Sequence, residues 1–463
     1  MRVTVMGLGL FGGGAGAVRY WCESGARVTV TDLRRPEELA ESLESLRDCR
    51  FEAVLGEHPE ELFVDTDLLV VNPAVPPSNP LYRKAVSHGI PVTTELELTL
   101  ANAPGRILCI TGSNGKSTTS GMLHAMVRAA HPGARLAGNI GISILPELRQ
   151  LAKGTPLVLE VSSFQIEHLS ESFRAPDVAI ITNLSANHLD RHGDCETYYA
   201  TKRKLFEGMA GDAAWVGNGT DGNQREWPRF IPAPGISAYL SDPGLPAAGF
   251  YRDAGDGAVA VRRTAAGEEA LFHASDLRLM GDHNRMNALQ AALAARAFGV
   301  EAGVIADALR HFQGLPHRME RVAEGSGICW INDSDATTPE STIAGLQSLS
   351  GDAVIIAGGV NKGMEFGAMG RAIAERTRAC VLIGRDAGQI ESAIRAAKRE
   401  HPVFIAKSLE EAMDCAAANL PRGGTVLFSP ACASFDMFRN FAERGDLFRE
   451  SARRRVGLEP TRR

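Results

Sequence analysis

The stretch that decides the fold is Ile107-Leu-Cys-Ile110, which runs directly into Thr111-Gly-Ser-Asn-Gly-Lys116-Ser117. A short apolar run followed by glycines is typical of a buried strand, a tight loop and a helix. In such a loop the backbone N–H groups wrap phosphates, a lysine neutralises charge and a serine ligates Mg²⁺. Ile110 stands where the common G-x-x-x-x-G-K-[ST] pattern has its first glycine. We predict an ATP site formed by Gly112, Ser113, Asn114, Gly115, Lys116, Ser117 and Thr118.

A second glycine loop opens the chain. The apolar run Val3–Met6 precedes Gly7-Leu-Gly9-Leu-Phe-Gly12, and Asp32 ends the next apolar run, 20 residues beyond Gly12. Glycines let the backbone approach a phosphate at a helix N-terminus, and an acid at this spacing can bond a ribose hydroxyl. The pattern indicates a nucleotide site, for NAD or for another nucleotide diphosphate. The alternative interpretation is a turn that only packs a helix on a sheet.

Short apolar runs alternate with helical patterns along nearly the whole chain, which predicts the α/β class with parallel sheets. Residues 101–105 and 313–317 carry the glycine and proline that mark boundaries. We predict three domains: a Rossmann-like domain at 1–104, a P-loop ATPase-like central domain with a parallel sheet at 105–313, and a Rossmann-like C-terminal domain at 314–463. Residues 210–278 are irregular and rich in Gly, Pro and Asp, and we interpret them as a β-rich excursion inside the middle domain.

Composition excludes several classes of protein. The 463 residues include 49 Lys and Arg against 55 Asp and Glu, and this net charge of −6 is unfavourable for binding a nucleic acid. We see no apolar stretch of about 18 residues, so we expect no membrane partner. The 8 cysteines form no CxxC pair, which argues against a zinc ribbon or a disulfide framework. Reduced thiols fit a cytoplasmic protein best.

Further segments follow the phosphate loop in a fixed order. They are Gly138–Gly141, Glu160–Gln165, Asn183–His192, Tyr198–Lys202, His283–Ala288, Gly314–Glu320, Asn332–Ser334, Gly358–Lys362 and Ser429–Gly445. With these segments the chain resembles the ATP-dependent Mur ligases over essentially its whole length. In that family ATP converts a carboxylate to an acyl phosphate, which an amine attacks with release of ADP and phosphate.

The segments Ser162-Ser-Phe-Gln165 and Ser429-Pro-Ala-Cys-Ala-Ser-Phe-Asp436 resemble the branch that adds D-glutamate to UDP-N-acetylmuramoyl-L-alanine. The resemblance therefore implies a monomeric ligase of cytoplasmic peptidoglycan precursor synthesis, and thereby a role in cell wall biogenesis, cell shape and division. A related ligase that adds L-glutamate or another amino acid to a UDP-muramoyl acceptor is the alternative. An NAD-dependent oxidoreductase would leave the phosphate loop unexplained, and a regulatory ATP-binding module would release no ADP in response to amino acids.

The resemblance also implies a metal site with two Mg²⁺ ions. Glu160 ends an apolar strand, where a carboxylate faces the ligand crevice of an α/β sheet. By resemblance Glu160 and His188 are Mg²⁺ ligands besides Ser117, and Lys202 is carbamylated, which turns a cation into an oxygen ligand. The bare context Lys202-Arg203-Lys204 instead indicates an exposed lysine, and Lys204 is the alternative in register. Lys116, Glu160, His188 and Lys202 form the predicted catalytic set.

The remaining predicted site residues are assigned by resemblance to three ligands. The ATP pocket adds four residues, namely Asn284, Asn287, Arg318 and Asp333, with His317 as a further nucleotide contact. The UDP-sugar is assigned to Leu10, Phe11, Asp32, Arg34 and Asn139. The amino-acid substrate is assigned to Thr337, Lys362, Ser434 and Phe441.

Two positions depart from the family pattern. Asp335 stands where some relatives carry lysine, and this reversed charge is expected to weaken binding of a dianionic amino acid unless Lys362 or a remodelled loop compensates. Asn72-Pro-Ala74 replaces a more usual Ser-Pro-Gly near the uracil site, and Ala74 is expected to alter that loop.

Overall fold

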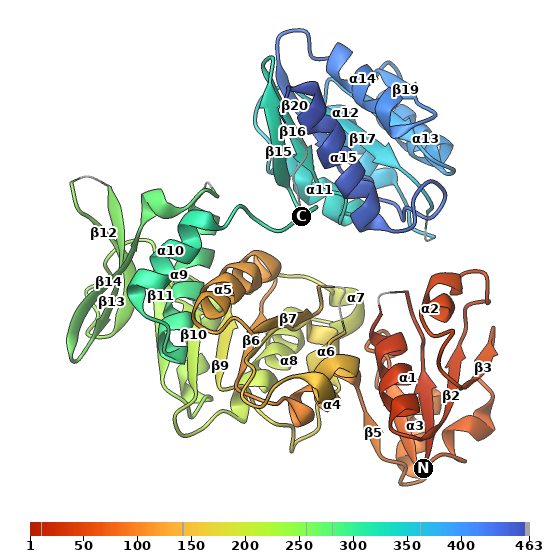
Figure 1. Cartoon of the computed structure of the whole chain (residues 1–463), viewed down its shortest axis with the longest axis vertical. Coiled ribbons are helices and arrows are strands. Elements are labelled where there is room, and N and C mark those ends of the chain that lie inside the picture. Colours follow the sequence, from red (N-terminus) through yellow and green to blue (C-terminus); the bar gives the residue numbers. More distant parts are fainter. Residues whose placement is uncertain (11, 141–142, 256, 280, 362, 459–463) are drawn as a thin grey trace. The chain divides into compact units, whose positions relative to one another are not determined.

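The computed structural model describes the chain apart from residues 11, 141–142, 256, 280, 362 and 459–463, so the predicted site residues Phe11 and Lys362 lie outside the described residues. The chain divides into two compact units, Met1–Phe312 and Gln313–Arg463. Its described strands form three sheets (Figure 1), two in the first unit and one in the second. The predicted α/β class with three domains is confirmed, while the domain bounds stay a prediction.

The first sheet is parallel throughout and has the strand order β3-β2-β1-β4-β5. Its strands are β1 (Arg2–Met6), β2 (Arg27–Asp32), β3 (Glu52–Leu55), β4 (Leu68–Val71) and β5 (Val92–Thr93). The helices around it are α1 (Gly13–Glu23), α2 (Ala40–Glu44), α3 (Pro80–Ser87) and α4 (Glu95–Asn102). The sequence predicts a helix over Pro36–Leu46, but only its middle is helical because turns occupy residues 36–39.

The central sheet has the order β14-β13-β12-β11-β10-β9-β6-β8-β7, parallel from β7 to β12 and antiparallel beyond. Its strands are β6 (Ile107–Thr111), β7 (Arg135–Gly138), β8 (Leu157–Glu160), β9 (Val178–Ile181), β10 (Ala214–Asn218), β11 (Gly235–Tyr239), β12 (Ala248–Asp253), β13 (Ala258–Thr264) and β14 (Gly267–His273). The predicted excursion at 210–278 is therefore β-rich, but its strands extend the central sheet.

Helices cover both faces of this sheet. They are α5 (Lys116–Ala130), α6 (Ser163–Glu167), α7 (Leu189–His192), α8 (Cys195–Glu207), α9 (Asp282–Phe298) and α10 (Ala302–His311). Successive side chains of β6 enter different cores, because Ile107 and Cys109 belong to one buried cluster and Leu108 and Ile110 to another. A strand buried on both faces needs an unbroken apolar run, which explains the sequence pattern. Short 3-10 helices occur at Glu60–Phe63, Leu145–Gln150, Gly222–Gln224, Trp227–Arg229 and Ala274–Asp276.

The second unit is a sheet of order β15-β16-β20-β17-β18-β19 in which only the β15–β16 pair is antiparallel. Its strands are β15 (Glu320–Gly325), β16 (Ile328–Asn332), β17 (Ala353–Gly358), β18 (Ala379–Ile383), β19 (Val403–Ile405) and β20 (Gly424–Phe428). Its helices are α11 (Pro339–Gln347), α12 (Gly367–Arg376), α13 (Ala387–Ala397), α14 (Leu409–Ala418) and α15 (Phe441–Arg455). Across the described residues of both units, no helix has the length and apolar character needed to span a membrane.

The first glycine loop generates a test of the fold. A Cβ built on Gly14 would lie 2.2 Å from the carbonyl oxygen of Leu8, whereas one on Gly13 meets nothing within 4 Å. We expect Gly14→Ala to destabilise the protein by about 1 to 3 kcal/mol, because α1 must move away from rigid backbone. Gly13→Ala should stay within about 0.5 kcal/mol of the wild type. Urea denaturation measures both, and equal stabilities of the two variants would contradict this packing.

Candidate active site

The phosphate loop lies between the carboxyl end of β6 and the first turn of α5. Gly112 and Gly115 have φ angles of 144° and 81°, which L side chains rarely adopt. The Lys116 ammonium folds back over the loop and donates to the carbonyl oxygens of Gly112 at 3.0 Å and Ser113 at 2.9 Å. The buried Ser117 is in the first turn of α5. A helix N-terminus with a cation beside it is a site for an anion such as a phosphate.

Helix α9 carries both predicted asparagines and packs against this loop through Asn287. A Cβ on Gly115 would come within 2.6 Å of the Asn287 side-chain oxygen, so Asn287 packs directly against the loop. Asn284 lies one turn earlier on the same helix face. Gln290 anchors the helix by donating to the carbonyl oxygen of Ile181 at 2.9 Å. The structure therefore places Asn287 beside the phosphate loop, and its role in the ATP pocket stays a prediction.

Glu160 is the last residue of β8 and is only 2% exposed. It pairs in register with Ile110, immediately before the phosphate loop. One carboxylate oxygen accepts a hydrogen bond from the side chain of Asn139 at 3.0 Å. The other, Oε2, is buried and has no hydrogen-bond partner among the described residues. A buried carboxylate oxygen without a partner is costly, and a hard cation would satisfy it.

Lys202 is 1% exposed on α8, so the interpretation of an exposed basic helix is wrong for this residue. Its ammonium lies 3.4 Å from the Thr111 hydroxyl and 4.7 Å from the Tyr198 ring centre. Burial lowers the pKa of Lys202 well below its usual value, and the Lys116 cation lowers it further, while Glu160 raises it. Its neighbour Lys204 instead donates to the carbonyl oxygen of Leu169.

His188 precedes α7 and has a left-handed φ of 52°. Its ring packs 4.9 Å from the Phe164 ring, and desolvation lowers its pKa, with the Lys116 and Lys202 cations acting in the same direction. A neutral imidazole is the form that binds metals. In the described part of the chain, no group of three or more His, Cys, Asp or Glu residues is arranged so that it could hold a metal ion by itself. A metal bound by Glu160 and His188 would therefore also need oxygen ligands from a hydroxyl group, from a carbamate on a lysine or from a phosphate.

The first domain places Asp32 beneath its glycine loop. The Asp32 carboxylate accepts hydrogen bonds from the backbone N–H groups of Gly9 at 3.0 Å and Arg34 at 2.9 Å, so it braces the turn that contains Leu10. Asn72, a departure from the family pattern, donates to the carbonyl oxygen of Gly7 at 3.3 Å and accepts from the N–H of Ala74 at 3.0 Å. Asn72 therefore links its own loop to the glycine loop.

In the second unit, Asp333 faces inward. Its two carboxylate oxygens accept hydrogen bonds from the Met319 N–H at 3.0 Å and the Ser429 hydroxyl at 2.7 Å, and burial raises the pKa of Asp333 to about 7. Arg318 is half-exposed, and its guanidinium lies 3.4 Å from the carboxylate of Asp335. The reversed charge at Asp335 is thus opposite a predicted ATP ligand. His317 is buried with a left-handed φ of 61°, and Thr337 is partly buried.

Arg444 is a buried residue that the sequence reasoning missed. It donates to the Ser334 hydroxyl at 3.0 Å and to the carbonyl oxygens of Ser334 at 2.9 Å and Cys432 at 3.0 Å. It thereby holds the loop of the predicted residue Ser434, whose buried hydroxyl has no partner among the described residues. The i, i+3, i+7 spacing of Phe441, Arg444 and Phe448 places all three on one face of α15. This pattern is the sequence feature that indicates an inward-facing Arg444.

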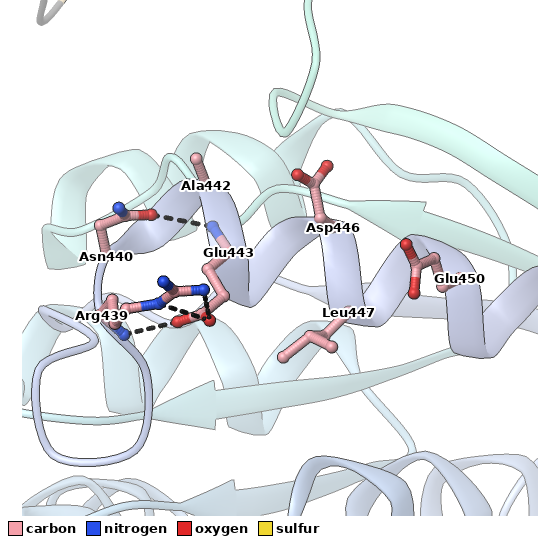
Figure 2. Close-up of a pocket in the computed structure, with 7 residues that line it drawn as sticks. All are labelled: Arg439, Asn440, Ala442, Glu443, Asp446, Leu447 and Glu450. Carbon is pink, nitrogen blue, oxygen red and sulfur yellow. Dashed lines mark hydrogen bonds and ion pairs between the residues drawn. The ribbon is translucent and has the colours of Figure 1, made fainter. Parts of the chain in front are cut away.

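A surface hollow of about 490 Å³ lies along the start of α15 (Figure 2). It is lined by Arg439, Asn440, Ala442, Glu443, Asp446, Leu447 and Glu450. Arg439 and Glu443 form an ion pair at 2.7 Å, so these two charges compensate each other. The predicted site residues do not line this hollow, although Phe441 is its neighbour along the chain.

The fold and the phosphate loop, with a buried carboxylate and lysine beside it, define an α/β enzyme of the phosphate-loop class. The chain matches the Mur ligase MurD-like N-terminal domain over residues 1–94, the Mur ligase middle domain over 110–295 and the Mur ligase glutamate ligase domain over 317–432. The chain therefore belongs to the Mur ligase family, whose members are ATP-dependent ligases.

Two relatives match almost the full length. The UDP-N-acetylmuramoylalanine–D-glutamate ligase of Roseiflexus sp. (strain RS-1) is 37% identical over 97% of both chains. The ligase of the same name from Pelotomaculum thermopropionicum is 37% identical over 97% of this chain and 96% of its own. The crystal structure of the UDP-N-acetylmuramate-alanine ligase of Thermotoga maritima covers 99% of this chain and 98% of its own with a TM-score of 0.55 and 18% identity, which supports the fold alone.

The raised pKa of Asp333 generates a prediction for stability. Between about pH 4 and pH 7 the folded protein keeps a proton on Asp333 that the unfolded chain has released. This contribution to stability is complete below about pH 4 and is lost as the pH rises through about 7. We expect Asp333→Asn to remove that part of the pH dependence. Urea denaturation at several pH values compares the two proteins, and identical pH profiles would contradict the assignment.

Proposed function

We propose that this protein is an ATP-dependent ligase that joins D-glutamate to UDP-N-acetylmuramoyl-L-alanine through an acyl phosphate, with release of ADP and phosphate. The observation that carries the proposal is the cluster at the carboxyl ends of β6 and β8. There a phosphate loop, the unpartnered oxygen of Glu160 and the buried Lys202 lie together in one unit. The full-length relatives named for this reaction support the same choice of substrates.

The residues around the loop divide the work of phosphoryl transfer. Lys116 and the N–H groups at the start of α5 would hold the ATP phosphates, and Asn284 and Asn287 would complete that side of the pocket. Ser117, Glu160 and His188 would hold Mg²⁺, for which we propose two ions. Bound Mg²⁺ supplies charge neutralisation where phosphate and carboxylate oxygens meet. Arg318 and Asp333 are proposed to bind the same nucleotide.

The other two ligands are assigned to the outer domains. We propose that Leu10, Phe11, Asp32, Arg34 and Asn139 bind the UDP-sugar, and that Thr337, Lys362, Ser434 and Phe441 bind the amino acid. Because Asp335 lies opposite Arg318, its charge is partly compensated within its own unit, and we retain D-glutamate as the substrate. We further propose that the enzyme acts as a monomer in the cytoplasm.

Lys202 is proposed to carry a carbamate. Burial lowers the pKa of Lys202 and so favours the neutral amine, which is the form that attacks CO₂. The nitrogen forms a bond to the carbon of CO₂, one C=O π bond opens to place the negative charge on oxygen, and the nitrogen releases a proton to water. The product is an anion with two oxygens close to Thr111 and Glu160. It removes the like-charge repulsion with Lys116 and adds an oxygen ligand for Mg²⁺.

An isotope-transfer experiment tests the function. The acceptor is labelled with oxygen-18 in its terminal carboxylate and incubated with Mg·ATP and either D- or L-glutamate. An acyl phosphate passes one labelled oxygen to the released phosphate, which ³¹P NMR detects, and mass spectrometry detects the amide. We expect label transfer and product with D-glutamate. Product with L-glutamate alone would show that the chirality is wrong, and no transfer with any amino acid would refute the ligase.

A second experiment tests the carbamate. In buffer containing ¹³C-bicarbonate, we expect a protein-bound carbamate signal in the ¹³C NMR spectrum of the wild type. Lys204→Ala is the matched control, because Lys204 is on the same helix but bonds to Leu169, and it should keep the signal. Lys202→Ala should lose the carbamate signal, and its kcat should fall at least about 100-fold. A signal that survives in Lys202→Ala would contradict the assignment.

A further inference from the structure

Arg191 connects the two domains of the first unit. It lies on α7, three residues after His188, and its side chain is 13% exposed. The guanidinium donates to three successive backbone carbonyl oxygens of the loop that follows β4: Pro73 at 3.1 Å, Ala74 at 2.9 Å and Val75 at 3.2 Å. Three carbonyl acceptors from one turn define the position of that turn closely.

The same guanidinium also contacts α6. Its Nε and Nη2 donate to one carboxylate oxygen of Glu167 at 3.0 and 2.9 Å. The guanidinium carbon Cζ lies 5.1 Å from the centre of the Phe164 ring. Helix α6 starts after Ser162, directly beyond Glu160 and the end of β8. Arg191 therefore joins the segment after Glu160 to the segment after His188, and Glu167 compensates its charge.

On its other side, the loop that Arg191 holds is tied to the first glycine loop. Asn72, at the start of that loop, bonds to the N–H of Ala74 and to the carbonyl oxygen of Gly7. A continuous series of contacts thus runs from the glycine loop through Asn72 and Ala74 to Arg191. From there it continues through Glu167 to α6.

We propose that Arg191 is a positioning residue that couples binding of the UDP-sugar to the ordering of the metal and nucleotide site. This inference rests on the function proposed above. The loop 72–75 and helix α6 accept hydrogen bonds from the same Arg191 guanidinium. When a ligand orders either segment, it also orders the guanidinium N–H groups that hold the other segment. A planar guanidinium can donate in several directions within one plane, which the point charge of a lysine cannot reproduce. Binding at one site then changes affinity at the other, and the coupling is reciprocal.

Arg149 provides a matched control. It also reaches from the central domain to the first domain, where its guanidinium lies 4.6 Å from the Tyr20 ring centre and donates to the Ser24 hydroxyl. These partners are at the C-terminal end of α1, whereas the glycine loop is at the opposite end. Arg149→Ala therefore removes an interdomain contact of similar kind without touching the loop 72–75 or α6.

The experiment measures the dissociation constant of UDP-N-acetylmuramoyl-L-alanine by calorimetry, with and without Mg²⁺ and a non-hydrolysable ATP analogue. In the wild type and in Arg149→Ala we expect the nucleotide to tighten binding at least about fivefold. In Arg191→Ala the two dissociation constants should agree within about twofold, and Arg191→Lys should fall between. Steady-state kinetics should show a raised KM for the UDP-sugar and a lowered kcat in Arg191→Ala but not in Arg149→Ala.

Several outcomes would overturn the proposal. The first is a wild type in which the nucleotide does not tighten UDP-sugar binding, and the second is an Arg191→Ala variant with the same tightening as the wild type. The third is an equal loss of this coupling in Arg149→Ala, which would show a general effect of interdomain contact. Circular dichroism and thermal unfolding check that each variant is folded, and Arg191→Lys carries the test if Arg191→Ala is not. A wild type that forms no amide would refute the proposed function, whereas an active wild type matched by Arg191→Ala would refute only this inference.

Discussion

The burial of β6 on both faces is the constraint on which the rest of the structure depends. Its side chains alternate between two apolar clusters, and it is flanked by β8 and β9, so its carboxyl end cannot shift without disturbing the centre of the sheet. The phosphate loop begins at that end. Glu160 is placed by the pairing of β8 with β6, and Lys202 and Asn287 are placed by helices packed over the loop. The arrangement of the candidate active site is therefore a consequence of how one strand is packed.

Buried charged groups that oppose folding are concentrated beside the phosphate loop. A buried lysine close to a second lysine opposes folding in a medium of low dielectric constant, and so does a carboxylate oxygen that has no hydrogen-bond partner among the described residues. Such groups persist where the surrounding structure holds them, and they commonly mark functional sites. A net charge of −6 gives no sign of this local arrangement, in which cations gather where anionic substrates are expected.

The predictions from the sequence succeed and fail for identifiable physical reasons. The strands around Ile107, Leu157 and Val178 were predicted because buried parallel strands are continuous apolar runs. The helix over Pro36–Leu46 was too long, since turns take up its first residues. Arg444 has no predicted role in the sequence analysis because two of its three acceptors are backbone carbonyls of distant residues, which a sequence pattern does not reveal.

The sequence by itself determined the strand–loop–helix units and the two glycine loops, because periodicity and glycine conformations are local properties of the chain. Only the tertiary structure decided which charges are buried. Lys202 and Lys204 are indistinguishable in a basic run, yet one faces the phosphate loop and the other faces Leu169. Likewise the charge of Asp335 is partly compensated by Arg318, which lies 17 residues away in the chain. Burial and pairing depend on what packs against a residue, and those neighbours come from distant segments.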